Sequence, residues 1–209
     1  EEAFAREMNR YAKLLGMKNT YFTNSTGWPH PDLKTTSKDL IILTKNLIKN
    51  FPKLYTLFNE KTFKYNNIKQ SNRNPLLYSV NGADGLKTGH TNESGYGLIG
   101  SVERNNRRVT IIINGINSKK KRTFESKRLF DIVFRETTLL SLFENKKSLA
   151  NANVWLGKLS KINLIAENNI KKIISPLEFN KTKIKIVWND PISAPIKKND
   201  RVGKIFITM

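Results

Sequence analysis

The sequence predicts an α+β fold, with helices and an antiparallel sheet in residues 1–147 and a small β-rich domain in residues 148–209. Three observations indicate this division. Apolar residues recur at helical spacing near the start of the chain. They alternate with period two in the segments after residue 94, as strands require. Beyond residue 150 the apolar segments become short and prolines separate them.

Composition limits the kinds of site that the chain can form. The 209 residues suffice for one or two domains with a sizeable core, and 38% of them are hydrophobic. There are no cysteines, which excludes disulfides and thiolate metal ligands. The two histidines, His30 and His90, are too few for a zinc site without several carboxylates. We therefore expect neither a metal nor a cofactor.

The formal net charge is +20, from 37 basic and 17 acidic residues. Such a charge attracts polyanions such as nucleic acid, anionic lipid headgroups and acidic wall polymers. However, lysine recurs on nearly every segment, and asparagine and isoleucine are abundant too, which is the bias of an AT-rich genome. No nucleic-acid-binding motif accompanies the charge, so a nucleic-acid binder ranks last among the hypotheses.

Two amphipathic helices are predicted in the first part of the chain. Residues 1–15 place apolar side chains on one face, and Gly16 ends that helix. A second helix begins at Thr36, with Asp39 in the capping position three residues on. The segment 50–52 ends it, because proline disfavours helical backbone in the residue before it.

The glycine-rich stretch 82–91 contains the sequence Lys87-Thr88-Gly89. Glycine lets a ligand or another backbone approach closely. A lysine ammonium beside a threonine hydroxyl provides a positive charge and a hydrogen-bond donor, which together fit a small carboxylate at a strand edge. The simpler interpretation is an exposed edge strand on which Lys87 prevents pairing with other chains.

The period-two pattern predicts two strands, residues 95–103 and 108–116, joined by a hairpin turn at 104–107. A charged loop is expected at 118–122, and a helix at 123–135. Lys146 and Lys147, within the polar segment 145–148, mark the domain boundary. The β-rich domain then has its strands at 152–157, 161–166, 183–188 and 201–208.

A series of short motifs is distributed along nearly the whole chain. In their order and sequence, these motifs resemble those of the low-molecular-mass penicillin-binding proteins, the serine-type D-Ala-D-Ala carboxypeptidases. K-T-G accompanies S-x-x-K and a serine-asparagine motif in such proteins. The matching segments are Met8-Asn9, Leu15-Gly16-Met17-x-Asn19-Thr20, Thr36-Ser37-x-Asp39-Leu40, Asn72-Arg73-Asn74-x-Leu76-Leu77, Asp84-Gly85-Leu86-Lys87-Thr88-Gly89-His90-Thr91, Val154-Trp155-x-Gly157 and Ala194-Pro195-Ile196-x-Lys198-x-Asp200.

The resemblance implies a fold and an activity. Residues 1–147 would be the C-terminal portion of a serine β-lactamase/DD-peptidase-like catalytic domain, and residues 148–209 the family's C-terminal β domain, incomplete at its end. The implied reaction is acyl transfer to a serine, which removes the terminal D-alanine from a peptidoglycan pentapeptide. The implied partners are that peptide and β-lactam antibiotics. The implied location is the cell envelope, periplasmic or on the outer face of the inner membrane.

Roles at the site follow from the resemblance, residue by residue. Lys87 would be the catalytic residue in this chain, by contributing positive potential and helping to hold the proton-transfer network. Thr88 would donate a hydrogen bond to the terminal carboxylate of the substrate, and Arg73 would pair with that carboxylate. Gly89 would leave room for the substrate beside the strand, and His90 would shape the cleft wall.

The chain departs from the family pattern because S-x-x-K and S-x-N should precede everything present here. Ser118-x-x-Lys121 matches S-x-x-K formally but follows K-T-G, in the predicted charged loop, and Tyr65-x-Asn67 lies in an extended segment. We therefore expect that this chain lacks the nucleophile and is inactive alone. The resemblance also implies a C-terminal amphipathic helix that associates with the membrane surface, and we expect none within residues 1–209. The alternative is a non-catalytic module that binds peptidoglycan stem peptides.

Overall fold

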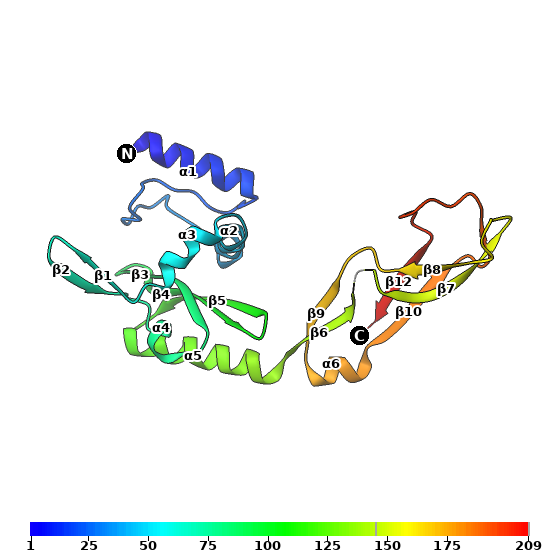
Figure 1. Ribbon diagram of the computed structural model, residues 1–209. Helices are drawn as coiled ribbons and strands as arrows, with labels where there is room; N and C mark the ends of the chain where they lie inside the picture. Colours follow the sequence, from blue (N-terminus) through cyan, green and yellow to red (C-terminus); the bar gives the residue numbers. More distant parts are fainter. Residues whose placement is uncertain (145, 209) are drawn as a thin grey trace. The chain divides into compact units, whose positions relative to one another are not determined.

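The computed structural model describes residues 1–144 and 146–208 (Figure 1). Asn145 in the predicted boundary segment and Met209 at the end of the predicted β domain lie outside the described residues. The chain divides by its contacts into two compact units, Glu1–Val133 and Phe134–Met209. This division falls ahead of the boundary at 147/148 that the sequence predicts.

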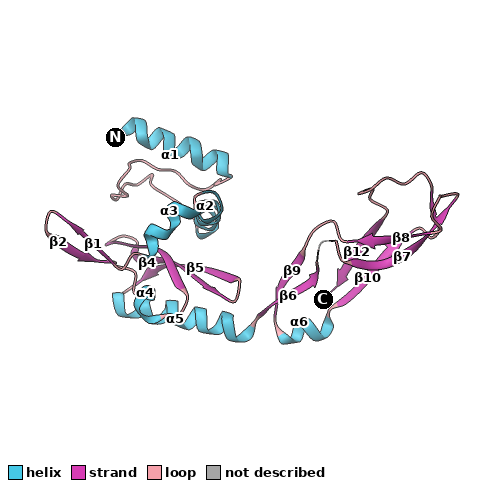
Figure 2. Ribbon diagram, in the orientation of Figure 1, coloured by secondary structure: helices cyan, strands magenta, loops and turns pink. Residues whose placement is uncertain are grey.

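The first unit combines helices with an antiparallel sheet, and the second consists mainly of strands (Figure 2). The helices are α1 (Glu2–Leu15), α2 (Ser37–Asn50), α3 (Pro52–Tyr55), the 3₁₀ helix η1 (Thr56–Asn59), α4 (Leu76–Ser79), α5 (Lys119–Glu136) and α6 (Pro176–Lys181). The strands of the first unit are β1 (Thr62–Tyr65), β2 (Ile68–Ser71), β3 (Ala83–Thr91), β4 (Gly95–Arg104) and β5 (Arg107–Ile116). Those of the second are β6 (Thr138–Phe143), β7 (Ser148–Trp155), β8 (Lys161–Ile165), β9 (Ile170–Ile174), β10 (Lys183–Trp188), β11 (Ile192–Ser193) and β12 (Gly203–Thr208). The α+β class is confirmed.

The sheet at the centre of the first unit has the order β3-β4-β5, and both pairs are antiparallel. The predicted hairpin between β4 and β5 is present, and its turn residues Asn105 and Asn106 both have positive φ. Asparagine tolerates that left-handed backbone, which matches the twist of a two-residue hairpin. Gly100 on β4 lies close to α4 and α5: a Cβ there would be 2.6 Å from Leu76 Cδ1 and 3.1 Å from the Phe130 ring. These two helices therefore cover one face of the sheet.

Polar contacts hold the two predicted helices α1 and α2 to the loop between them. Asn9 Nδ2 donates to Phe22 O at 2.7 Å, and Phe22 N donates back to Asn9 Oδ1 at 2.8 Å. The buried Asp39 accepts at Oδ2 from Asn19 N and from Thr20 Oγ1, both at 2.7 Å. Several of the motif residues identified in the sequence are thus partners in the fold.

The predicted charged loop at 118–122 is wrong, because α5 begins at Lys119. Ser118 Oγ accepts a hydrogen bond from Lys121 N at 3.2 Å, as a helix-capping serine does. The lysines of the first turn lie on the exposed side of the helix, where their charge opposes no packing. A run of lysines is therefore compatible with a helix start.

The second unit is built from small sheets, ordered β11-β7-β8, β10-β12 and β6-β9. The β6-β9 pairing places Thr138–Phe143 in this unit, which is why the division by contacts comes early. The predicted small β domain is confirmed, and it also contains the short helix α6. Ser175 and Glu178 form a capping box at the start of α6, with Pro176 in its first turn. Among the described residues, no helix combines the length and apolar character needed to cross a membrane.

Candidate active site

The K-T-G sequence lies on β3, which is an edge strand of the sheet. β3 pairs with β4 on one side, and within residues 1–144 and 146–208 no strand pairs with its other side. Lys87 and Gly89 are exposed, whereas Thr88 between them is buried. Because successive side chains of a strand point to opposite faces, a ligand that meets both Lys87 and Thr88 must lie along the free edge.

The space beside Gly89 is open. A Cβ added at Gly89 would have no atom within 4 Å, and its φ lies outside the left-handed region. Nothing in the described fold therefore requires glycine at this position. A ligand that lies directly against the strand would explain the glycine, because a residue without a side chain allows close contact with the backbone.

The ammonium and hydroxyl of the motif have few partners within the chain. Lys87 Nζ donates to the carbonyl oxygen of Thr88, so its charge stays at the strand edge. The side chain of Thr88 makes no hydrogen bond with any described residue. Both groups thus remain available to a ligand.

His90 stacks on Tyr96, its partner in the β3-β4 register, with ring centroids 3.9 Å apart and planes tilted by 33°. The guanidinium carbon of Arg122, on α5, lies 5.7 Å from the centre of the Tyr96 ring. Burial lowers the pKa of Arg122, and the nearby Tyr96 opposes that shift. In the part of the chain that the structure describes, Arg122 Nε has no hydrogen-bond partner. The end of β3 is therefore packed on Tyr96 of β4, which in turn contacts Arg122 of α5.

Arg73 lies in the turn between β2 and α4, and its side chain is exposed. The asparagines on either side hold the turn. Asn72 Nδ2 donates to Glu60 O at 2.9 Å, and the buried Asn74 accepts at Oδ1 from Leu76 N at 3.1 Å. The helical turn α4 that follows packs against β3. Arg73 therefore sits on a rigid turn in the same unit as K-T-G, while no interaction joins it directly to Lys87 or Thr88 among the described residues.

A partly buried polar cluster, which the sequence did not reveal, fixes the start of β3. Asp84 Oδ1 accepts from Tyr55 Oη at 2.8 Å and from Arg108 Nη1 at 2.8 Å. Arg108 also donates to Ser101 Oγ at 2.6 Å and pairs with Glu103. The cluster joins α3, β3, β4 and β5. We call these five residues the Asp84 cluster.

The cluster leaves no room for a side chain at Gly85. A Cβ there would be 2.7 Å from Tyr55 Oη. Burial raises the pKa of Tyr55 to about 12, and the hydrogen bond and charge of Asp84 act in the same direction, against a lowering by Ser101 and Arg108. The Tyr55 hydroxyl therefore stays protonated as a donor to Asp84. The aspartate and glycine of Asp84-Gly85 were visible in the motif, but their partners are far away in sequence.

Comparison with known proteins establishes the class. A family model described as D-alanyl-D-alanine carboxypeptidase matches residues 1–118, and one described as the C-terminal domain of penicillin-binding protein 5 matches residues 138–209. The chain therefore belongs to the D-alanyl-D-alanine carboxypeptidase family, as the resemblance in the sequence predicted.

Individual curated relatives support the same family. The chain is 34% identical over 207 residues to D-alanyl-D-alanine carboxypeptidase DacC of Escherichia coli, covering 98% of this chain and 52% of that protein. It is 32% identical over 206 residues to DacA of Haemophilus influenzae, covering 97% and 52%. The chain thus spans about half the length of the curated relatives it matches.

Solved structures agree in fold. The crystal structure of penicillin-binding protein 5 from Haemophilus influenzae superposes with a TM-score of 0.83 at 30% identity, covering 100% of this chain and 61% of that one. Penicillin-binding protein D2 from Listeria monocytogenes, solved in a cefotaxime-bound form, gives 0.59 at 36% identity and covers 63% and 55%.

Proposed function

We propose that the protein containing this chain is a serine-type D-Ala-D-Ala carboxypeptidase of the cell envelope. It would remove the terminal D-alanine from the pentapeptide stems of peptidoglycan. The observation that carries the proposal is the free edge of β3, where an exposed ammonium, an unengaged hydroxyl and open space beside Gly89 follow one another. Membership of the carboxypeptidase family supports it.

The residues of this chain would bind and orient the substrate. The peptide would lie along the edge of β3, with its terminal carboxylate near the Thr88 hydroxyl and the Arg73 guanidinium, because both donate hydrogen bonds to carboxylate oxygens. Lys87 would add positive potential where negative charge develops on the reacting carbonyl. His90, stacked on Tyr96, would form the wall beside Gly89.

The reaction needs a serine nucleophile. The serine oxygen would attack the carbonyl carbon of the penultimate D-alanine, and its proton would pass to the amine of the departing D-alanine. Water would then hydrolyse the ester and restore the serine. By the family pattern, the serine and its lysine partner belong to S-x-x-K, whose place precedes residue 1. We therefore propose that residues 1–209 alone do not acylate.

Binding of β-lactams is part of the proposal. The Listeria protein D2 has been solved with cefotaxime and with ampicillin bound, and it is 36% identical to this chain over the matched region. A β-lactam carries a carboxylate beside a reactive carbonyl, so the same groups on β3 would hold it.

The alternative is a binding module that holds stem peptides without cleaving them. One observation favours it. The single S-x-x-K match begins at Ser118, an exposed residue whose Oγ accepts from the backbone N–H of Lys121 at the start of α5. Ser118 thus acts as a helix cap, and among the described residues no hydrogen bond joins its hydroxyl to the Lys121 ammonium that would have to activate it.

Labelling with a fluorescent penicillin tests the proposal. The 209-residue chain is compared with a longer chain that extends upstream to include an S-x-x-K motif. Labelling of the longer chain alone supports the carboxypeptidase. Labelling of the 209-residue chain would overturn the statement that it lacks a nucleophile, and Ser118→Ala would then be the first variant to make. If neither chain is labelled, the binding module is favoured.

A further inference from the structure

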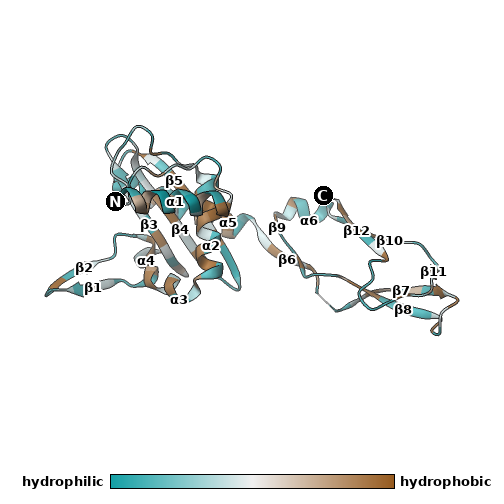
Figure 3. Ribbon diagram, turned by 90° about the horizontal axis from the view of Figure 1, so that it is seen from above, coloured by the Kyte–Doolittle hydropathy of each residue, from teal (hydrophilic) through white to brown (hydrophobic). Residues whose placement is uncertain are grey.

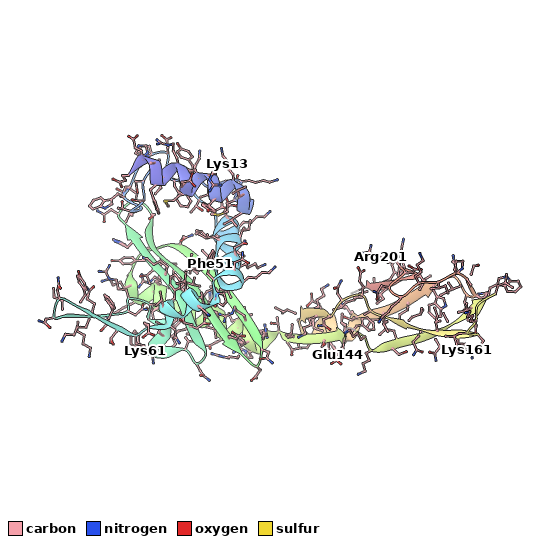
Figure 4. All side chains as sticks on the ribbon, turned by 45° about the horizontal axis from the view of Figure 1, so that its top comes forward. Lys13, Phe51, Lys61, Glu144, Lys161 and Arg201 are labelled. Carbon is pink, nitrogen blue, oxygen red and sulfur yellow. The ribbon has the colours of Figure 1, made fainter. Side chains whose placement is uncertain are left out.

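The end of the β7-β8 hairpin exposes large apolar side chains. We call residues 155–161 the hairpin tip; all of them are exposed. Trp155 is 59% exposed, Leu156 85% and Leu159 67%. Figure 3 shows the hydrophobic colour at this end of the hairpin, and Figure 4 labels Lys161, where β8 begins. Exposed apolar side chains that form a contiguous patch are one mark of an interaction site.

Local folding does not explain the choice of leucine at position 156. Its φ is +57°, in the left-handed region that favours glycine or asparagine. The turn itself is closed by other groups, since Val154 N donates to Ser160 O at 2.9 Å. Leu156 therefore holds an unfavourable backbone conformation. Because its side chain is almost fully exposed, it contributes little packing energy in return. A role outside the fold would account for it.

The surroundings of the tip are basic. The tip carries Lys158 and Lys161 and no acidic residue. The loop after β11 runs beside it, because Ala194 N donates to Trp155 O at 2.9 Å. That loop carries Lys197 and Lys198.

The neighbouring acidic side chains already have partners within the chain. Asp190 accepts hydrogen bonds from the backbone and the amide of Asn153, both at 2.8 Å, and it also attracts Lys161. Asp200 accepts from Lys197 N at 2.7 Å, and Arg201 pairs with Glu167. No ion pair involves Lys158 or Lys198 among the described residues. The tip therefore combines exposed apolar groups with positive charge.

We propose that the hairpin tip inserts into the headgroup region of a bilayer that contains anionic phospholipid. Trp155 would lie at the interface, where tryptophan is enriched, and Leu156 and Leu159 would reach the start of the acyl chains. Lys158, Lys161, Lys197 and Lys198 would contact the anionic headgroups. A convex tip can enter a bilayer without a complementary cavity, which a protein partner would have to provide. The proposal is independent of the carboxypeptidase activity and of any helix beyond residue 209.

Vesicle binding by the chain tests the proposal. The vesicles contain equal parts of phosphatidylglycerol and phosphatidylcholine. Leu156→Asn removes the apolar group, keeps the charge and suits the positive φ. We expect this change, combined with Leu159→Asn, to weaken binding at least tenfold. The matched control is Leu177→Asn, which removes a leucine that is 73% exposed on α6 of the same unit and should leave binding unchanged.

Tryptophan fluorescence locates the contact. We expect the vesicles to shift the emission of the chain to shorter wavelength, and lipids brominated on the acyl chain to quench it. Both effects should disappear in Trp155→Phe. The proposal would be overturned if the Leu156→Asn/Leu159→Asn variant still bound the vesicles, or if the vesicles did not change the tryptophan emission. Either result would indicate attraction by the net charge alone. Loss of self-association in the tip variant, with vesicle binding intact, would overturn it in favour of a second copy of the chain.

Discussion

The two halves of β3 differ in what holds them. Ala83–Leu86 is locked by the Asp84 cluster, and Gly85 touches the Tyr55 hydroxyl so closely that no side chain fits. Lys87–Thr91 has β4 on one side, open space at Gly89 and exposed side chains at Lys87 and His90. The first half thus resembles a core and the second a surface, within one continuous strand.

The difference separates stability from function along the strand. A change in the first half should lower the free energy of unfolding, because it disturbs partly buried hydrogen bonds. A change in the second half should leave the fold intact and affect only what the free edge binds. The predictions that follow test this separation, from the largest expected effect to the smallest.

Lys87→Met should lower the rate of acylation by penicillin by about a hundredfold or more, in a longer chain that labels, because it removes a preorganised positive charge. The unfolding free energy should stay within about 0.5 kcal/mol, since the side chain is exposed. Labelling rate and urea unfolding measure the two effects. Lys64→Met, on the exposed strand β1, is the control. A labelling rate within a few-fold of the wild type would show that Lys87 has only the edge-protecting role.

Arg108→Ala should lower the unfolding free energy by about 3 kcal/mol, because it leaves the half-buried Asp84 without its cation. Urea unfolding of the chain measures this. Arg128→Ala is the control, since Arg128 forms an equally short but more exposed pair with Glu125 on α5. That pair should contribute less than about 0.5 kcal/mol. If the two variants lost equal unfolding free energy, the Asp84 cluster would hold the first half of β3 no more firmly than an exposed ion pair does.

Gly85→Ala and Gly89→Ala make the same chemical change four positions apart on one strand. Gly85→Ala should cost about 1–3 kcal/mol, because its methyl group overlaps the Tyr55 hydroxyl. Gly89→Ala should leave stability unchanged or raise it by a few tenths of a kcal/mol. It should nevertheless slow labelling of the longer chain if a ligand lies against the strand. If Gly89→Ala destabilises the chain as much as Gly85→Ala, the second half is not open.

Tyr55→Phe should change the response to alkaline pH. The pKa of Tyr55 in the folded state is about 12, above its ordinary value of about 10, so its contribution is fully present below about pH 10 and is lost as the pH rises towards 12. The phenylalanine variant should therefore lose less stability over that interval. Unfolding midpoints across this range measure the difference. Tyr65→Phe, at a residue that is 66% exposed, should behave as the wild type does.

The sequence was sufficient for those features that depend on local patterns. The spacing of apolar residues predicted α1 and α2, the alternation predicted β4 and β5, and the motif order predicted the family. The capping box formed by Ser175 and Glu178 is also recognisable in the sequence, and it would have predicted α6. The lysine run after Ser118 was misread, because a charged segment can be either a loop or the exposed first turn of a helix.

The Asp84 cluster could not be predicted in this way. Asp84 meets Tyr55 and Arg108 across 29 and 24 positions of sequence. Which residues face each other there depends on the register of β3, β4 and β5, and a shift by one residue would send every side chain to the other face. The roles of Lys87, Thr88, Gly89, His90 and Arg73 remain predictions from the family.

The long separation of these partners has a consequence for synthesis on the ribosome. Asp84 and the K-T-G residues emerge before Arg108, and β4 and β5 must emerge before the strand has a sheet to join. Contacts between distant residues form only after the intervening chain has closed into a loop. The Asp84–Arg108 pair therefore cannot form in the nascent chain until residue 108 has left the exit tunnel, and the first half of β3 gains this anchor only after β4 has been synthesised.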